Sequence, residues 1–409
     1  MKVLQINTVC GIGSTGRIAT DIDKMLKDNG HESYIAYGRD IPMNCNTAIR
    51  IGSKLDNYTH VAKTRLFDKH GFGSTKATHA FIRQIEELNP DVIHLHNIHG
   101  YYINIEILFE YLKLTNKSVI WTLHDCWAFT GHCSYFDNIN CDRWISGCFN
   151  CPQKNSYPSS VFMDNSKNNF TLKKEIFTNI KNLTIVTPSK WLAEVVSKSF
   201  LRNYSLKVIN NGIDLETFKP IECDLREKYN IYDKFIILGI ANRWIRSKGY
   251  DYFIELSERV EKDEVIIMVG LTEKQIKKLP SNIIGITRTN NTSELAEIYS
   301  SADVFINPTL ADNFPTTNLE AIACGTPVIT FDTGGSVECI DKSCGYTVEK
   351  GQLNEIIDKI QKIKDQGKLK YSQSCIQRAK SLYDKKKFCF NYMELYKHKL
   401  TNQESQKRT

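Results

Sequence analysis

No stretch of this 409-residue sequence is apolar for long enough to cross a bilayer. A membrane-spanning helix needs roughly 18 consecutive apolar residues or more, and every apolar run here is shorter. A secretion signal is not expected either. The segment from Met1 to Asn7 carries one lysine and a short apolar run before a glycine loop, which is typical of a buried strand. We therefore expect a protein of the cytoplasm.

Two further classes of protein are disfavoured. The 13 cysteines are an odd number and no export signal accompanies them, so a framework of disulfides is not expected. The net charge of +7 is mild and comes from lysines and arginines spread along the chain, and we expect no nucleic-acid partner. This balance suits phosphate-bearing ligands or peripheral contact with an anionic inner membrane, and a solvated basic surface explains it equally well.

Short apolar runs alternate with helical patterns along the chain, which predicts an α/β fold with parallel sheets. The runs form two series. The first series of expected strands is Val3–Asn7, Ser33–Tyr37, Val92–His96, Ser118–Thr122 and Thr184–Thr187. The second is Phe235–Ala241, Val265–Gly270, Ile283–Ile286, Val304–Asn307 and Pro327–Phe331. Two series in a chain of this length indicate two Rossmann-like domains of roughly 200 residues each.

The join between the domains is expected near Asn210–Asp214, a turn-rich stretch. The predicted parts are a domain over 1–205 with a cysteine-rich insert at 131–158, a domain over 206–383, a helix over 384–400 and a frayed tail over 401–409. Because ligands of open α/β sheets bind at the carboxyl ends of the strands, the chemistry should come from loops that follow strands.

The first candidate site is the loop 10–17, Cys-Gly-Ile-Gly-Ser-Thr-Gly-Arg, between the first strand and a helix. Its glycines, Gly13 among them, let the backbone approach a ligand closely, and the start of a helix favours an anion. A dinucleotide site would need an acidic residue about 20 positions further on, at the end of the second strand. That strand ends in Tyr37, Gly38 and Arg39 instead. We therefore disfavour NAD and keep a tight turn without a ligand as the alternative.

The second candidate site is the loop 242–249, Asn-Arg-Trp-Ile-Arg-Ser-Lys-Gly, after the first strand of the second series. Arg243 can grip phosphate oxygens in a fork, and Lys248 adds a point charge. Two fixed cations beside a diphosphate would stabilise the charge that develops when a sugar–phosphate bond breaks. The alternative is a solvated basic turn.

The third candidate site is the segment 312–321, Asp-Asn-Phe-Pro-Thr-Thr-Asn-Leu-Glu-Ala. A helix that begins near Asn318 would offer free N–H groups to a phosphate. Because carboxylates accept hydrogen bonds from hydroxyls, Asp312 and Glu320 are candidates to bind sugar and ribose hydroxyls. A helix cap and a solvated charge would be the alternative for this pair.

Taken together, in their order along the chain, the three candidate sites are a more specific sequence signal than each is alone. An Arg-x4-Lys-Gly motif, an acid-x7-Glu pair and the sequence Cys-Gly-Thr-Pro-Val-Ile from Cys324 follow one another in the second series of strands. In this the chain resembles the retaining glycosyltransferases of family 4, of the type found in bacterial capsule, exopolysaccharide and O-antigen clusters. The resemblance covers nearly the whole chain. It implies the GT-B fold, in which two Rossmann-like domains face each other across a cleft and the last helix crosses back onto the first domain.

The resemblance implies a role for each matching residue of the second domain. Arg243 and Lys248 match the basic pair on the donor diphosphate, and Glu320 matches the carboxylate that binds the donor ribose. Asp312 matches an acid, usually a glutamate, that faces the transferred sugar. The loop whose backbone contacts sugar and phosphate is matched by Phe314, Thr316 and Thr317.

In the first domain, the loop around Gly13 matches the glycine loop near the diphosphate and the acceptor. His124, just past a predicted strand, matches the active-site histidine that contacts the donor sugar. The alternative for His124 is a buried ring satisfied by a backbone carbonyl. We expect Asp125 to orient this ring, and His96, at the end of another strand, is a weaker candidate for contact with substrate.

The activity implied by the resemblance is transfer of a hexose-type sugar from a nucleotide-sugar co-substrate to a lipid-linked or glycan acceptor, with retention, in bacterial surface polysaccharide biosynthesis. No residue is placed for a covalent glycosyl-enzyme. A front-face substitution is therefore expected, to which the protein contributes orientation and electrostatics. We expect no cofactor for catalysis and no catalytic divalent metal. An epimerase-type sugar-nucleotide enzyme and a non-catalytic scaffold of the envelope assembly stay open as alternatives.

A cysteine-rich segment follows the His124 loop. Its spacing is His-Cys-x7-Cys-x6-Cys-x2-Cys, and the thiols are Cys133, Cys141, Cys148 and Cys151. Thiolates at close spacing in a cytoplasmic protein favour zinc, so these four are candidate ligands of a structural zinc that would pin the loop. Buried free cysteines packed with aromatic residues are the alternative.

Overall fold

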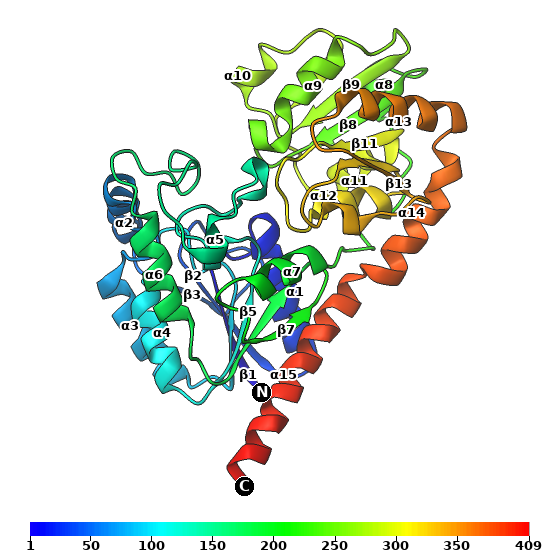
Figure 1. Cartoon of the computed structure of the whole chain (residues 1–409). Helices are drawn as coiled ribbons and strands as arrows, with labels where there is room; N and C mark the ends of the chain where they lie inside the picture. The colour runs from blue at the N-terminus through cyan, green and yellow to red at the C-terminus, as the bar shows by residue number, and fades with distance from the viewer. Residues whose placement is uncertain (409) are drawn as a thin grey trace. The chain divides into compact units, whose positions relative to one another are not determined.

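The chain forms two compact units in the computed structural model, which describes residues 1–408, with side chains as far as residue 403. The first unit comprises Met1–Asn210 together with Cys389–Thr409, and the second comprises Asn211–Phe388. Both are α/β structures built on one parallel sheet (Figure 1). Each unit is described separately below.

The first unit is built on a seven-stranded sheet of order β3-β2-β1-β4-β5-β6-β7. Its strands are β1 (Lys2–Asn7), β2 (Glu32–Tyr37), β3 (Ala48–Arg50), β4 (Val92–Leu95), β5 (Ser118–Thr122), β6 (Leu183–Thr187) and β7 (Ser205–Val208). The central strands β4, β5 and β6 are buried along their whole length, as expected for a parallel sheet covered on both faces. The strand order reverses between β1 and β4, and loops that leave such a point diverge and open a crevice for ligands.

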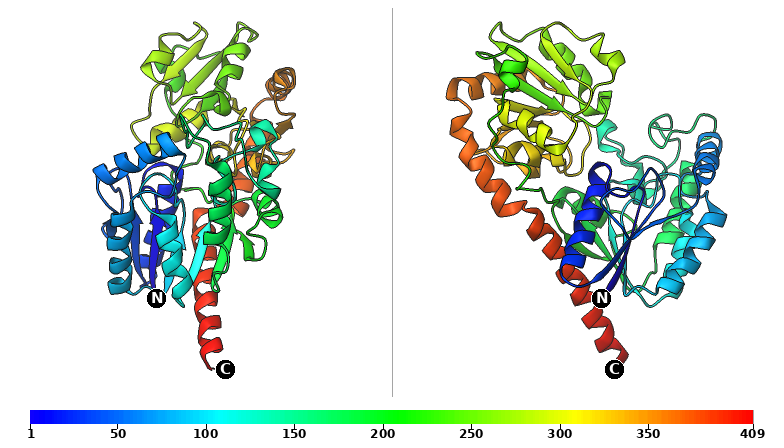
Figure 2. Two further views of the ribbon diagram at one scale, coloured as in Figure 1. Left: turned by 60° about the vertical axis from the view of Figure 1, so that its left-hand side comes forward. Right: turned by 180° about the vertical axis from the view of Figure 1, so that it is seen from behind.

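Helices cover both faces of this sheet. The helices and short 3-10 turns are α1 (Gly13–Asp28), α2 (Lys54–Phe67), α3 (Thr75–Leu88), α4 (Ile105–Leu114), η1 (Trp127–Phe129), η2 (Asp137–Ile139), α5 (Arg143–Ser146), α6 (Ser166–Phe177) and α7 (Lys190–Lys198). Figures 1 and 2 show α3, α4 and α6 on one face, and α1, α7 and the end of the chain on the other.

The second unit has a six-stranded parallel sheet of order β10-β9-β8-β11-β12-β13. The strands are β8 (Phe235–Ile240), β9 (Glu264–Val269), β10 (Ile283–Ile286), β11 (Val304–Asn307), β12 (Val328–Phe331) and β13 (Gly345–Val348). The helices are α8 (Leu225–Lys228), η3 (Arg246–Lys248), α9 (Tyr250–Ser257), α10 (Glu273–Ile276), α11 (Thr292–Ser301), α12 (Thr316–Ala323), η4 (Ser336–Cys339), α13 (Leu353–Gln366) and α14 (Leu369–Leu382). Here the strand order reverses between β8 and β11, so the loops after these two strands border the ligand crevice.

The last helix, α15 (Lys385–Arg408), begins in the second unit and continues in the first. It runs to Arg408, beyond the Leu400 at which we expected the helix to end, and Thr409 lies outside the described residues; the fraying expected for 401–409 stays a prediction. Within the first unit, the Tyr396 hydroxyl lies 2.7 Å from Nδ1 of His94, and the Tyr392 hydroxyl lies 2.9 Å from Oγ1 of Thr122. The helix is therefore attached to the sheet by buried hydrogen bonds as well as by apolar packing.

The expected strands all occur, with ends that shift by a few residues. The sequence patterns missed β3, β7 and β13, which are edge strands of the two sheets. In β3 and β7 no residue is fully buried. An edge strand contacts fewer apolar neighbours than a central one, so its sequence carries a weaker apolar pattern.

We predict that Tyr396→Phe destabilises the first unit by about 1–3 kcal/mol, because it leaves Nδ1 of the buried His94 without its partner. Urea denaturation followed by circular dichroism measures the loss. Tyr34→Phe is the matched control, since the Tyr34 hydroxyl makes only an exposed bond to Glu32. Equal stability of the two variants would contradict the anchoring of α15 by His94.

Candidate active site

In the second unit, the loops after β8 and β11 are tied together. The backbone N–H of Leu310 donates to the carbonyl of Ser247 at 2.8 Å, and the Thr309 hydroxyl donates to the same oxygen at 3.3 Å. Gly249 has φ +80°, and a Cβ atom there would lie 2.5 Å from the carbonyl oxygen of Pro308. Only glycine lets the two loops approach this closely, so the residues that they carry are held at one edge of the sheet.

Lys248 and Asp312, one from each loop, form an ion pair. Nζ of Lys248 lies 2.6 Å from Oδ2 of Asp312, and the two side chains are 36% and 18% exposed. Arg243 lies in the same loop as Lys248, is exposed, and makes no hydrogen bond or ion pair to any described residue. The structure thus brings three of the predicted residues to the two loops at the switch point, with one cation balanced by a carboxylate and the other open to solvent.

The helix α12 starts at Thr316, two positions earlier than near Asn318 as we expected. Pro315 precedes it and supplies no side-chain cap, so the first-turn amides, including those of Thr316 and Thr317, have no capping side chain. Phe314 is buried, and its ring lies 5.7 Å from that of Tyr383. The arrangement presents partly exposed N–H groups just after Asp312, which suits a phosphate.

Asn318 has a structural role. Its side chain accepts from Nδ2 of Asn307 at 2.8 Å and donates to Oγ of Ser336 at 3.1 Å. These buried bonds join the end of β11, helix α12 and the loop after β12, so they position the loop between β11 and α12.

Glu320 lies in α12 and is buried, with 2% of its surface exposed. Its Oε2 accepts a hydrogen bond from the Tyr299 hydroxyl of α11 at 2.9 Å. The structure therefore ties Glu320 to the helix behind it, and the binding of ribose hydroxyls that we expect for this carboxylate stays a prediction.

In the first unit, the glycine loop leads directly into α1. The N–H of Gly11 donates to the carbonyl of Gly16 at 3.1 Å, and a Cβ at Gly11 would clash with the backbone of Met43. Gly13 has φ +65° with open space where a Cβ would be, and Ile12 gives the helix no side-chain cap. The loop is thus fixed at Gly11 and exposed at Gly13, as a site for an anion requires.

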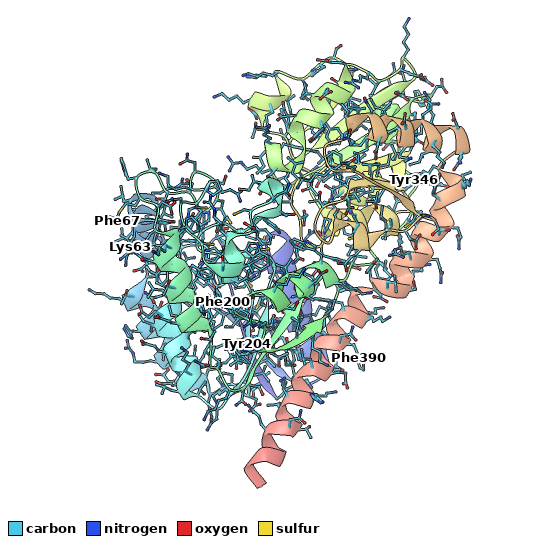
Figure 3. The ribbon with its side chains drawn as sticks, viewed as in Figure 1. Lys63, Phe67, Phe200, Tyr204, Tyr346 and Phe390 are labelled. Carbon is cyan, nitrogen blue, oxygen red and sulfur yellow. The ribbon has the colours of Figure 1, made fainter. Side chains whose placement is uncertain are left out.

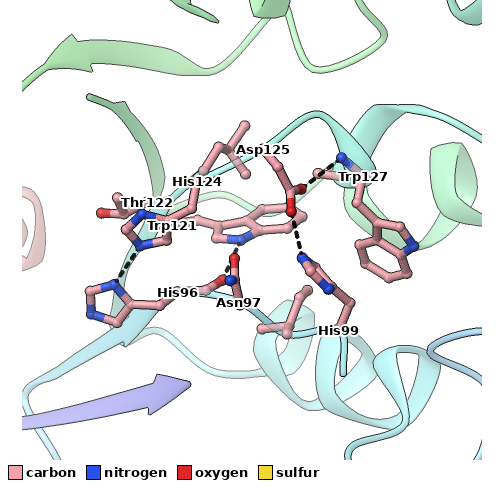
Figure 4. A pocket seen from close by; sticks show the side chains of 11 residues that line it. His96, Asn97, His99, Trp121, Thr122, His124, Asp125 and Trp127 are labelled. Carbon is pink, nitrogen blue, oxygen red and sulfur yellow. Dashed lines mark hydrogen bonds and ion pairs between the residues drawn. The ribbon is translucent and has the colours of Figure 1, made fainter. Parts of the chain in front are cut away.

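A pocket lies where β4 and β5 end, and we call it the β4–β5 pocket (Figure 4). Its lining consists of the segments 96–99 and 121–125 with Trp127 and Ala128. His124 lines one side of the pocket and is half-buried. Its Nε2 lies 3.1 Å from Nδ1 of His96. Nε2 of His96 lies in turn 3.0 Å from Oε1 of Gln5 on β1.

The direction of this hydrogen-bond chain follows from its inner end. Nε2 of Gln5 donates to the carbonyl of Ala19 at 2.9 Å, so Oε1 of Gln5 faces His96 and can only accept. His96 therefore carries its proton on Nε2. Burial lowers the pKa of His96 well below its usual value, so the ring is neutral and its Nδ1 accepts from His124.

His124 is left with a defined chemical character. Burial is the main cause that lowers the pKa of His124 to about 4, against an opposing effect of Asp125. The ring is then neutral at pH 7, with the proton on Nε2 and a lone pair on Nδ1. Such a ring can accept a hydrogen bond from a sugar hydroxyl, which fits the role expected for His124.

Asp125 does not orient His124 as we expected. Its Oδ2 pairs with Nε2 of His99 at 2.9 Å, and its Oδ1 accepts from the N–H of Trp127 (Figure 4). Burial opposes ionisation of Asp125, but His99 and the Trp127 amide outweigh it, and the pKa of Asp125 is lowered. The residue that holds His124 is His96, which is buried itself.

Sequence reasoning missed His99 and Gln5. A glutamine inside the otherwise apolar strand Val3–Asn7 was an available signal, because a buried amide requires polar partners. His99 had no comparable signal, since its pairing with Asp125 joins loops that follow two different strands.

The four cysteines of the insert line one pocket together with His132 and aromatic side chains. A thiol hydrogen bond with Cys151 raises the pKa of Cys133 and lowers that of Cys151 to about 7. Burial raises the pKa of Cys148 to about 11, and its sulfur accepts from the N–H of Gly131. The insert is pinned by His132, whose Nδ1 lies 2.6 Å from Oδ1 of Asp68.

Across residues 1–403, where side chains are described, no group of three or more His, Cys, Asp or Glu side chains is arranged to hold a metal ion. The one Asp-x-Asp triplet of the sequence, Asp21-Ile22-Asp23, lies in α1, where Asp23 is buried and pairs with Lys27 at 2.8 Å. Structural zinc on Cys133, Cys141, Cys148 and Cys151 and catalysis without a divalent metal both stay predictions.

Two successive Rossmann-like units with these loops define the GT-B class of glycosyltransferases. The family model "Glycosyltransferase Family 4" matches residues 15–217, and the model "Glycosyl transferases group 1" matches residues 222–382. The chain belongs to the family 4 glycosyltransferases. It is an enzyme of surface polysaccharide biosynthesis, and this decides against the epimerase and the scaffold that the sequence left open.

Individual relatives agree with this assignment. WcaC of Escherichia coli K12, a glycosyl transferase named for colanic acid biosynthesis, is 25% identical over 373 residues, which cover 87% of this chain and 89% of that protein. The N,N'-diacetylbacillosaminyl-diphospho-undecaprenol alpha-1,3-N-acetylgalactosaminyltransferase of Campylobacter jejuni is 27% identical over 222 residues, 50% of this chain and 58% of that one. The structure of Anabaena HepE in complex with UDP has a TM-score of 0.70 at 15% identity and covers 97% of this chain and 100% of that chain.

We predict that His124→Asn keeps more activity than His124→Gln or His124→Ala. Asparagine places its amide near the position of Nδ1 and can still accept from a hydroxyl, whereas glutamine places it near Nε2 and restores only the bond to His96. Loss of one such bond, about 1–3 kcal/mol, lowers the rate roughly 5- to 160-fold.

Initial rates of donor turnover measure this difference. The exposed His79→Asn is the control, and its rate should equal that of the wild type. If His124→Gln outperformed His124→Asn, the direction assigned to the hydrogen-bond chain would be wrong.

Proposed function

We propose that the protein transfers a hexose-type sugar, with retention, from a uridine-diphosphate donor to a lipid-linked glycan acceptor. The observation that carries this proposal is the Lys248–Asp312 pair, held at the switch point of the second unit beside the uncapped start of α12. The donor class is supported by the solved structure of HepE, which contains UDP. The acceptor class is supported by the Campylobacter jejuni relative, whose name specifies a diphospho-undecaprenol.

Binding of the donor would rearrange the ion pair. A diphosphate carries more negative charge than a single carboxylate, so Lys248 would turn from Asp312 to the phosphate oxygens, while Arg243 adds a fork of donors from the same loop. The first-turn amides of α12 would add hydrogen bonds to the same group. Asp312, released from Lys248, would accept a bond from a hydroxyl of the transferred sugar.

The chemical step then depends mainly on charge stabilisation. Cleavage of the sugar–phosphate bond moves negative charge onto the diphosphate, and fixed cations in a partly desolvated site stabilise that charge more than the ground state. The acceptor hydroxyl would attack from the face that the diphosphate leaves, and the leaving phosphate would take its proton. Neutral His124 would hold a sugar hydroxyl through Nδ1 without adding a competing charge.

The place of action is part of the proposal. Within residues 1–408 no helix has the length and apolar character that crossing a bilayer requires. We place the enzyme in the cytoplasm, where nucleotide sugars are made, in peripheral contact with the anionic inner leaflet that carries a lipid-linked acceptor.

The proposal is tested first with a panel of nucleotide sugars. One uridine-diphosphate hexose should be hydrolysed slowly without acceptor, and proton NMR of the released sugar at early times should show the anomer of the donor. Failure of every nucleotide sugar to bind or to be hydrolysed would contradict the proposed function, and the opposite anomer would contradict retention.

We predict that Lys248→Ala lowers the rate of donor turnover by about 100-fold or more, since it removes a cation aimed at the leaving diphosphate. Arg243→Ala should also be impaired. Arg246→Ala is the matched control, because Arg246 lies in the same loop, is 89% exposed and makes only a 3.8 Å contact with Asp251. Turnover of Lys248→Ala at the rate of Arg246→Ala would remove Lys248 from the site.

A further inference from the structure

Helix α2 of the first unit has the reverse of the usual arrangement of polar and apolar residues. Its buried residues are His60 and Thr64, both polar. Leu55 and Tyr58 on its outer side are 71% and 70% exposed, and Leu66 and Phe67 at its end are also exposed. Surface helices normally bury their apolar side, so this apolar face needs another explanation.

The orientation of α2 is fixed by His60. Nε2 of His60 accepts from the N–H groups of Gly71 and Gly73 at 3.1 and 3.2 Å, and its Nδ1 lies 3.0 Å from Oγ of Ser74. Burial lowers the pKa of His60 to about 3, so the ring is neutral at pH 7, and both of its nitrogens have hydrogen-bond partners. Rotation of the helix to bury Leu55 and Tyr58 would break these bonds, so the apolar side stays outside.

A second apolar segment lies against the end of α2. The residues Val161, Phe162 and Met163 are exposed, and Phe162 is the most exposed of them at 71%. The N–H of Val161 donates to the carbonyl of Arg65 at 2.8 Å, and the Ser160 hydroxyl donates to the same oxygen. The segment therefore extends the apolar face of α2, and Figure 3 shows Phe67 with Lys63 at this outer end of the first unit.

We define the α2–insert surface by its exposed apolar residues: Leu55, Tyr58, Leu66, Phe67, Val161, Phe162 and Met163. Contiguous exposed patches of this kind mark interaction sites. The cations at its border are exposed as well, and they are Lys54, Arg65, Lys69 and Lys167.

The acidic residues at the border are already bound within the protein. Asp56 caps α2 through the N–H and hydroxyl of Ser53, and Asp164 accepts from the N–H groups of Cys151 and Ser166. These hydrogen bonds lower the pKa of both carboxyl groups, so both stay ionised, but four cations against two carboxylates leave the border with a net positive charge. An apolar face with a basic border is complementary to a bilayer with anionic headgroups, because the side chains enter the acyl boundary while the cations meet the headgroups.

The same surface is connected to the β4–β5 pocket. Tyr157 lies four positions before Val161, and its hydroxyl lies 3.2 Å from Nδ1 of His99, which lines the pocket. One short segment thus runs from the pocket to the apolar surface. A lipid-linked acceptor has its chain in the bilayer and its glycan in water, so a pocket beside a membrane-bound surface suits its geometry.

We infer that the α2–insert surface docks the protein on the anionic face of a lipid bilayer. This inference deepens the proposed function, which includes membrane contact, by naming the surface that makes it; the docking itself is argued from the exposed apolar residues and their basic border. A second copy of the chain is the competing occupant, and the experiment separates the two.

The test is flotation of the full-length protein with vesicles of phosphatidylethanolamine and phosphatidylglycerol, and with vesicles of phosphatidylcholine alone. The variants are Phe162→Gln/Met163→Gln in the segment that follows the insert and Leu55→Gln/Tyr58→Gln on α2. Leu114→Gln is the matched control, because Leu114 is 87% exposed. It ends α4 beside the start of β5, at the end of the strands opposite to the β4–β5 pocket. Far-ultraviolet circular dichroism and donor hydrolysis without vesicles check that each variant is folded.

Wild type and Leu114→Gln should float with the anionic vesicles, and binding should fall as salt is added. Each double variant should lose about tenfold or more in partition coefficient, because two large side chains no longer enter the lipid. Equal binding of the double variants and Leu114→Gln, or no binding of the wild type to anionic vesicles, would overturn the inference. A wild-type dimer in vesicle-free sedimentation that the double variants dissociate would overturn it too. Vesicle binding with no donor hydrolysis would refute the proposed function and leave the docking surface standing.

Discussion

The ion pair between Lys248 and Asp312 is the interaction on which the donor side of this enzyme depends. The two residues come from loops that follow β8 and β11, neighbouring strands at which the strand order reverses. Gly249 allows these loops to touch, and bonds to the carbonyl of Ser247 keep them together. A lysine held this way is preorganised for an anion, and its partner is a carboxylate that a diphosphate can displace. Arg243, in the same loop, is exposed, which is compatible with the proposed role on the diphosphate.

A comparable constraint organises the first unit, although its groups are neutral. Gln5, fixed by the carbonyl of Ala19, sets the proton on His96, and His96 in turn sets the proton on His124. A buried amide on the first strand thus determines which nitrogen of a pocket histidine can accept a bond. The neighbouring pair of His99 and Asp125 is a separate arrangement that joins the loops after β4 and β5 and leads, through Tyr157, to the insert.

Much of this architecture could be predicted from the sequence, because the central strands are buried on both faces and therefore apolar along their length. The edge strands β3, β7 and β13 escaped prediction for the converse reason. In the site, the motifs that contain Lys248 and Asp312 were expected at one edge of the sheet because both follow strands, but their ion pair was not foreseen. The pairing of Asp125 with His99 instead of His124, and the burial of Glu320 against Tyr299, could not be foreseen, since they depend on how side chains from different elements pack. The apolar outer face of α2 was missed because the helical pattern of its sequence does not indicate which side of the helix is buried. The hydrogen bonds of His60 determine which side faces the protein.

A crystal structure of the protein with uridine diphosphate bound would test the role of the Lys248–Asp312 pair most directly. We predict that Nζ of Lys248 leaves Asp312 and contacts the diphosphate, with Arg243 on the same group and the start of α12 facing it. A diphosphate bound elsewhere, with the Lys248–Asp312 pair still closed, would show that this pair is not the donor site.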